Sequence, residues 1–150
     1  MKAYKTILIP LDGSKLCGLA VDAALPLAKA FGARVVLCSA FDFAPERFGL
    51  YYELSVPEEF EREIRAHHEN TLNRAHERFV AEGVATTTVI EKGDPVTSIL
   101  ARARQEGADL IVMASHSRAA VPRFFLGSVT DRVLRQAPCP VLVVRPPESE

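Results

Sequence analysis

The 150-residue chain lacks the glycine-rich signatures of two large classes of nucleotide-binding enzyme. It has no Gly-x-Gly-x-x-Gly segment, and Gly13-Ser14-Lys15 has no glycine at the upstream position that a Walker loop requires. It also has no Gly-x-Ser-x-Gly nucleophile elbow and no His-Glu-x-x-His zinc motif. These absences exclude a Rossmann dehydrogenase and a P-loop NTPase.

Cysteines are few, and neither sign of charge is in clear excess. Cys17, Cys38 and Cys139 form no Cys-x-x-Cys pair, which favours a reducing compartment with buried or inert thiols. The formal net charge is −1 and the basic residues are scattered, which argues against nucleic acid or an anionic membrane surface as partner. The apolar run after Lys2 and Lys5 is too short for a secretory signal, and no run approaches a membrane span. We therefore expect a cytoplasmic protein.

The length and the hydrophobic runs predict one α/β domain over residues 1–150. With 48% hydrophobic residues, the chain can enclose one core but is too short for two ordinary domains. The near-continuous apolar character of the runs suits a mostly parallel sheet with helices on both faces. The five expected strands are Thr6–Leu11, Val35–Ala40, Thr86–Ile90, Leu110–Met113 and Val141–Val144.

Helical periodicity fills the intervals between these strands. The expected helices are Ser14–Phe31, about Pro57–Glu82, Asp94–Gly107 and a segment that opens at Ser128. Ser14 and Ser128 are capping residue types, and Asp94 followed by Pro95 is typical of a helix start.

The second predicted helix is the longest. Ser55 and Glu58 resemble a capping box at its start. His67, His68 and His76 lie along it without metal-ligand spacing, so we expect surface or half-buried side chains there. The buried stripe is expected to contain Phe60, Ile64, Leu72, Ala75 and Phe79.

Residues 108–144 carry the clearest functional signal. They predict a strand, a loop, a helix and a strand, with the small segment Ala114–Ser117 after the first strand and Gly127-Ser128 at the helix start. Such an arrangement brings small residues close to a helix N-terminus, which is the geometry that holds a phosphate on backbone N–H groups. We therefore predict an anion site. The side chains expected to offset its charge are Lys15, His116, Arg118 and Arg123.

Four segments of the sequence resemble the universal stress protein family. They are ILIPLDGS at Ile7–Ser14, EKGDP at Glu91–Pro95, DLIVMASH at Asp109–His116 and APCPVLVV at Ala137–Val144. The resemblance implies an adenine-nucleotide alpha hydrolase-like fold with an open five-stranded sheet of order 3-2-1-4-5. In that order strands 1 and 4 are neighbours at a topological switch point, where open α/β sheets bind ligands.

Nucleotide-binding members of the family carry a glycine, two residues, a second glycine, nine residues and then Gly-Ser or Gly-Thr. Here Ala114 and Ser117 occupy the positions of the first two glycines, and Gly127-Ser128 retains the last pair. A Cβ obstructs the approach of the backbone to a phosphate, and a positive φ costs a non-glycine residue about 1–2 kcal/mol. A tight ligand could offset that cost, so binding of ATP and loss of binding are both open.

The resemblance also implies a set of nucleotide contacts. Asp12 would lie near the ribose and near a Mg²⁺ ion that accompanies ATP, and Ala40 would line the adenine pocket. Each has a plainer alternative, because Asp12 and Ser128 could act as caps and Ala40 could pack in the core. The expected contacts are Pro10, Asp12, Ala40, Met113, Ala114, His116, Ser117, Arg118, Gly127, Ser128 and Val129.

Three functions fit the sequence. The first is a non-enzymatic stress-response module, a homodimer that binds ATP or a related adenine nucleotide as a regulatory ligand. The second is the same dimer without nucleotide, acting through protein contacts. The third is a slow ATP hydrolase, for which no motif commits Asp12 or His116 to the role of general base.

Two segments predict protein contacts or ligand enclosure. An apolar edge strand invites pairing with another chain, and related proteins dimerise through their last strand. The aromatic segment Phe41–Val56 is either a lid over the ligand or packing at the sheet edge. The residues expected to form the dimer contact are Val141, Leu142, Val143 and Val144.

Overall fold

Strands and helices alternate along the chain in the computed structural model, which describes residues 3–42, 58–115 and 126–147. The elements are β1 (Thr6–Pro10), α1 (Cys17–Phe31), β2 (Arg34–Phe41), α2 (Glu58–Ala81), β3 (Thr86–Lys92), α3 (Pro95–Glu106), β4 (Leu110–Ala114), α4 (Ser128–Gln136) and β5 (Val141–Val144). All strand pairs are parallel, and the order is β3-β2-β1-β4-β5. The predicted fold class and strand order are confirmed.

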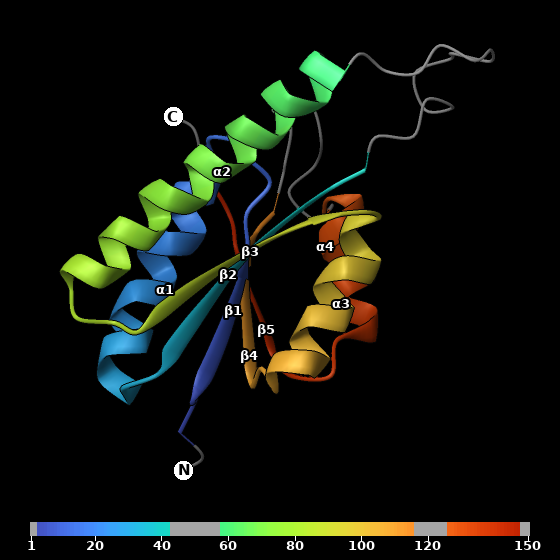
Figure 1. Ribbon diagram of the computed structural model, residues 1–150. Coiled ribbons are helices and arrows are strands. Elements are labelled where there is room, and N and C mark those ends of the chain that lie inside the picture. The colour runs from blue at the N-terminus through green and yellow to red at the C-terminus, as the bar shows by residue number, and fades with distance from the viewer. Residues whose placement is uncertain (1–2, 43–57, 116–125, 148–150) are drawn as a thin grey trace.

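Helices cover both faces of the sheet, with α1 and α2 on one side and α3 and α4 on the other (Figure 1). Ile7, Leu8 and Ile9 of β1 are fully buried. Because successive side chains of a strand point to opposite faces, Ile7 and Ile9 pack with Phe79 of α2, and Leu8 packs with Val133 of α4. Two covered faces explain why three consecutive residues of the strand, Ile7, Leu8 and Ile9, are all apolar.

The start of α1 differs from the prediction. The helix begins at Cys17 rather than Ser14, and its N-cap residue Leu16 makes no side-chain capping bond. The N–H of Ser14 donates to Asp12 Oδ1 at 2.9 Å, and Gly13 has φ +84°. The chain therefore completes a turn before the helix begins.

The start of α4 also differs in detail. Gly127 is the N-cap and Ser128 the first helical residue, so the expected cap at Ser128 is wrong. Gly127 has φ −58° and makes no use of the left-handed region. The start of α3 is as predicted, because Asp94 Oδ2 accepts a bond from the N–H of Thr97 at 2.9 Å.

Two predictions for α2 require correction. Phe60 is 48% exposed rather than buried, because the first turn of α2 extends beyond the carboxyl ends of the strands (Figure 1). His68 is buried, whereas a surface or half-buried side chain was expected.

The predicted capping residue Ser55 and most of the aromatic segment, residues 43–57, lie outside the described residues. Within the described ranges, no helix is long and apolar enough to cross a membrane, and no cluster of ligands could hold a metal ion.

Candidate functional site

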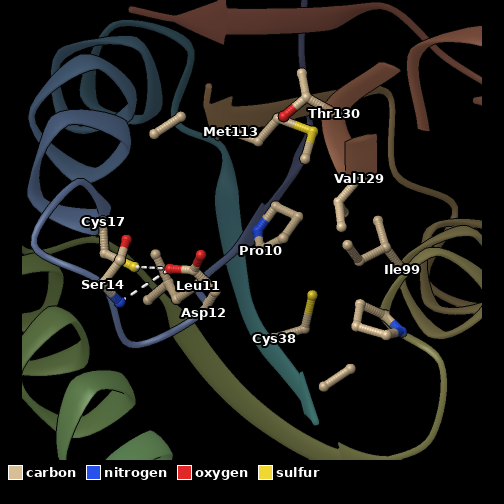
Figure 2. A pocket seen from close by; sticks show the side chains of 13 residues that line it. Pro10, Leu11, Asp12, Ser14, Cys17, Cys38, Ile99, Met113, Val129 and Thr130 are labelled. Carbon is tan, nitrogen blue, oxygen red and sulfur yellow. Dashed lines mark hydrogen bonds between the residues drawn. The ribbon is translucent and has the colours of Figure 1, made fainter. Parts of the chain in front are cut away.

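A cavity of about 130 Å³ lies where β1, β2 and β4 end, and we call it the strand-end cavity. It lies where β1 adjoins β4, the switch point at which open α/β sheets bind ligands. Figure 2 shows side chains from the strands and from α3 and α4 around it. The lining residues are Pro10, Leu11, Asp12, Ser14, Cys17, Cys38, Ala40, Pro95, Ile99, Met113, Ala114, Val129 and Thr130.

The structure brings several of the predicted contacts together at this cavity. Gly127 and Ser128 precede Val129 at the start of α4 and are not part of the wall. His116, Ser117 and Arg118 lie outside the described residues, as does Arg123. The predicted residues that line the cavity are Pro10, Asp12, Ala40, Met113, Ala114 and Val129.

The wall also contains residues that sequence reasoning missed. Cys38 precedes Ala40 by two positions in β2, so the period-two alternation of the strand could have placed both on one face. Pro95 and Ile99 are one helical turn apart at the start of α3, which follows β3 directly. Thr130, in the first turn of α4, is 2% exposed and lies beside Val129.

The loop between β1 and α1 holds the carboxylate of Asp12. Its Oδ1 atom accepts bonds from the N–H of Ser14 at 2.9 Å and from the thiol of Cys17 at 3.2 Å (Figure 2). The plainer role of Asp12, capping the turn before α1, is therefore present in the structure. These bonds also fix one carboxylate oxygen at the rim of the cavity.

The two thiols in the wall stay protonated near neutral pH. Burial raises the pKa of Cys38 to about 12, and the negative charge of Glu91 adds to this effect. Burial also raises the pKa of Cys17, with a further contribution from the neighbouring Asp12 carboxylate. Because the thiolate is the reactive form, these side chains act here as small apolar wall groups.

Two serine hydroxyls at this end of the sheet are buried without a hydrogen-bond partner in the described part of the chain. Ser14 Oγ belongs to the cavity wall, and Ser115 Oγ follows the last residue of β4. Leaving a buried polar group unsatisfied costs about 1–3 kcal/mol. A polar group arriving at either hydroxyl would remove that cost.

Comparison with known proteins identifies the family. The universal stress protein family model matches residues 3–145. The chain is 37% identical to a universal stress protein of Thermus aquaticus over 148 residues, spanning 95% of this chain and 99% of the relative. Accordingly, the chain belongs to the universal stress protein family.

Solved structures agree with this assignment. The structure of protein MJ0577 matches with a TM-score of 0.81 and 26% identity, over 99% of this chain and 100% of that one. A universal stress protein in complex with cAMP matches with a TM-score of 0.68 and 26% identity, over 96% of this chain and 98% of that one.

Proposed function

We propose that this protein is a stress-response module that binds an adenine nucleotide, ATP or a close relative, in the strand-end cavity as a regulatory ligand. The observation that carries this proposal is the position of the cavity at the β1–β4 switch point, lined by Asp12, Ala40 and Met113. The similar protein in complex with cAMP, itself an adenine nucleotide, supports it.

The adenine ring is the part of the nucleotide that suits the cavity. Ligand sites usually exceed about 300 Å³, so a cavity of about 130 Å³ suits the base rather than a whole nucleotide. Ile99, Met113 and Val129 offer apolar surface to the faces of a ring. An apolar wall with a few polar groups is typical of cofactor sites.

The main chain of Ala40 offers polar groups for the edge of the base. The N–H of Leu11 donates to the carbonyl of Cys38 at 2.8 Å, so that carbonyl points toward β1. Ala40 lies two residues further and directs its N–H and C=O to the same side, past the last residue of β1. One donor beside one acceptor matches the ring nitrogen and amino group of adenine.

We place the ribose at Asp12 and the phosphates at Ala114 and the start of α4. Gly127 caps α4 without a side-chain hydrogen bond of its own, so the cap residue leaves the first N–H groups of the helix to other partners. At α3, by contrast, Asp94 already caps the helix. The open N-terminus of α4 favours an anion, and a Mg²⁺ ion would accompany ATP. The predicted contacts His116, Ser117 and Arg118 belong to the same proposal.

Calorimetric titration with ATP and AMP tests this function. Ala40→Leu fills the cavity, and we expect it to weaken binding at least 30-fold, or about 2 kcal/mol. Ala101→Leu makes the same change on the exposed side of α3 and leaves binding unchanged. Ala114→Gly removes a Cβ beside the proposed phosphate site and tightens binding. Wild-type protein with no heat of binding and no change in its thermal melt at millimolar ATP or AMP would favour the nucleotide-free alternative.

We propose a regulatory rather than a catalytic role for the nucleotide. Both wall thiols are held protonated, and one oxygen of Asp12 is engaged in the turn before α1. These groups provide neither a nucleophile nor an unengaged base. Phosphate release from ATP well above the slow background, measured with purified protein, would contradict this part of the proposal.

We further propose a homodimer through β5, with Val141, Leu142, Val143 and Val144 in the contact. β5 is an edge strand with β4 as its neighbour, and Leu142 is 39% exposed. The N–H of Ser115 donates to the carbonyl of Val144 at 2.9 Å, and that of Ile111 donates to the carbonyl of Pro140 at 3.0 Å. The even-numbered residues of this strand therefore direct their backbone N–H and C=O groups toward β4. Val143 directs its backbone N–H away from β4.

Sedimentation at micromolar concentration tests the dimer. Val143→Pro deletes an outward donor without removing a bond to β4, so we expect it to weaken the dimer. Val143→Ala keeps the donor and serves as the control. A monomer mass for the wild type would exclude this contact.

A further inference from the structure

A second cavity, of about 390 Å³, lies between α1 and α2 on the other side of the β1–α1 loop. We call it the α1–α2 groove. Its floor is apolar, formed by side chains such as Val21 and Ala75, and its rim carries Lys15, Arg74 and Arg78. Within the described part of the chain, its lining contains cations and no carboxylate. The lining residues are Leu11, Gly13, Ser14, Lys15, Cys17, Gly18, Val21, His67, Thr71, Arg74, Ala75 and Arg78.

Among the residues that the structure describes, two of the three cations at the rim have no anionic partner. Arg78 pairs with Asp22 at 2.6 Å, and elsewhere on the surface Lys29 pairs with Glu82 at 2.7 Å. Lys15 and Arg74 make no hydrogen bond or ion pair with their side chains among residues 3–42, 58–115 and 126–147. They come from different segments of the chain and face one cavity, so an anion between them would interact with both.

The backbone on the α1 side adds positive potential. The N-cap Leu16 makes no side-chain bond, and the first turn of α1 contains no acidic residue. Gly18 lies in that turn and lines the groove, and a Cβ built on it would meet no atom within 4 Å. The buried, unpartnered hydroxyl of Ser14 belongs to the same wall.

Contacts from α2 hold the wall of the groove in place. The Nε2–H of His67 donates to the carbonyl of Gly13 at 3.0 Å. The neighbouring His68 is buried, bonds to the hydroxyl of Ser39 in β2 and stacks on Phe41. The loop and α2 are therefore held together without a ligand, which lowers the ordering cost of binding.

We propose that the α1–α2 groove is a second binding site, specific for a small molecule that carries a phosphate group. Lys15 and Arg74 form charge-assisted bonds to the phosphate oxygens, and Ser14 donates its hydroxyl. The uncharged part of the ligand lies on the apolar floor. The volume is within the range of about 300–1,000 Å³ for small-molecule sites.

Titration with inorganic pyrophosphate at low ionic strength, followed by calorimetry, tests the site. The double variant Lys15→Gln, Arg74→Gln should bind at least tenfold more weakly than the wild type. The double variant Lys5→Gln, Arg104→Gln removes the same charge from exposed positions outside the groove and should bind within twofold of the wild type. Absence of binding to the wild type, or equal weakening in both variants, overturns the proposal.

Gly18→Asp provides a variant that keeps the fold. Its side chain enters open space, and a carboxylate in the first turn favours the helix. The same carboxylate repels phosphate, so the affinity for pyrophosphate should fall at least tenfold while the thermal melt is retained. Unimpaired binding to this variant contradicts the site.

Repeating the titration in saturating AMP separates the two cavities. Pyrophosphate bound in the groove should still bind when AMP is present. Loss of its binding under AMP would assign pyrophosphate to the strand-end cavity and overturn the second site. If AMP does not bind at all, the proposed function fails, and the Lys15 and Arg74 comparison still decides the groove.

Discussion

The strand-end cavity and the α1–α2 groove share Leu11, Ser14 and Cys17 as wall residues, yet their chemistry differs. Core-facing side chains of strands and helices surround the cavity, so its wall is mostly apolar. The groove lies between the outer flanks of two helices, where charged residues are expected. A short loop thus separates an apolar site from a cationic one.

The turn at Gly13 produces this separation. Asp12 and Lys15 are three residues apart, but Asp12 lines the cavity and Lys15 lines the groove. The positive φ of Gly13 reverses the chain between them, and the bond from the Ser14 N–H to Asp12 closes the turn. Opposite charges near each other in sequence thereby line different cavities.

Gly13→Ala should have the largest effect, because it disturbs the turn that separates the two cavities. Its Cβ would approach the His67 ring to 2.8 Å, and φ is +84°. We expect the free energy of unfolding to fall by about 3 kcal/mol, about 1–2 from the backbone and the rest from displacing His67 and its hydrogen bond.

Gly83→Ala is the matched control for this change. Gly83 has φ +77°, and a Cβ at this position would meet no atom within 4 Å, so the variant should lose the backbone contribution alone. Urea unfolding of both variants measures the difference. Equal losses would show that the contact between the loop and α2 contributes little.

Acidification should weaken the packing of α2 on β2. The expected loss in the free energy of unfolding lies between those of the other two changes. Burial lowers the pKa of His68, His67 lowers it further, and Asp12 opposes both. The folded state therefore binds fewer protons than the unfolded state once the pH falls toward the ordinary histidine pKa of about 6.5. The free energy of unfolding should decrease from pH 7.5 to 5.5.

Histidine variants assign that pH dependence. Urea unfolding of His68→Gln at both pH values should show a smaller decrease than the wild type. His76→Gln, on the same helix, should keep the wild-type decrease, since the His76 ring bonds to the carbonyl of Thr86 and not to the partners of His68. An unchanged decrease in His68→Gln would assign the effect to other groups.

Gly18→Ala should give the smallest effect. It tests whether a change in the groove leaves the strand-end cavity unaffected. Alanine favours the helix by roughly 0.5–1 kcal/mol over glycine, and its Cβ meets no atom within 4 Å. We expect a slight rise in melting temperature and unchanged ATP affinity, because Gly18 lines the groove and not the cavity. Weaker ATP binding would show that the two sites are not separate.

Sequence patterns predicted the strands well, because a strand covered on both faces of a parallel sheet requires a run of consecutive apolar residues. β5 has the predicted bounds, and β4 extends one residue further than predicted, to Ala114. Helix starts were harder, because Ser14 and Ser128 are good capping residues by type but Leu16 and Gly127 hold the N-cap positions. The turn at Gly13 and the glycine before α4 decided these positions.

The cavity was predicted in part for a similar reason. Ala40 and Met113 were expected from the family resemblance, which implies a strand order with a switch point at these strand ends. Ile99 reaches the wall through the packing of α3 on the sheet. Phe60 was misplaced because helical periodicity gives the face of a helix but not how far the helix extends past the sheet.

The sequence by itself determined the family, the α/β class and the apolar strands whose carboxyl ends contain or adjoin Asp12, Ala40 and Ala114, because these depend on local residue type and spacing. Tertiary structure alone decided that the buried His68 bonds to the hydroxyl of Ser39 and that Lys15 and Arg74 line one groove. Those pairs lie far apart in the chain. Their meeting depends on how α1 and α2 pack on the sheet, which residue spacing does not encode.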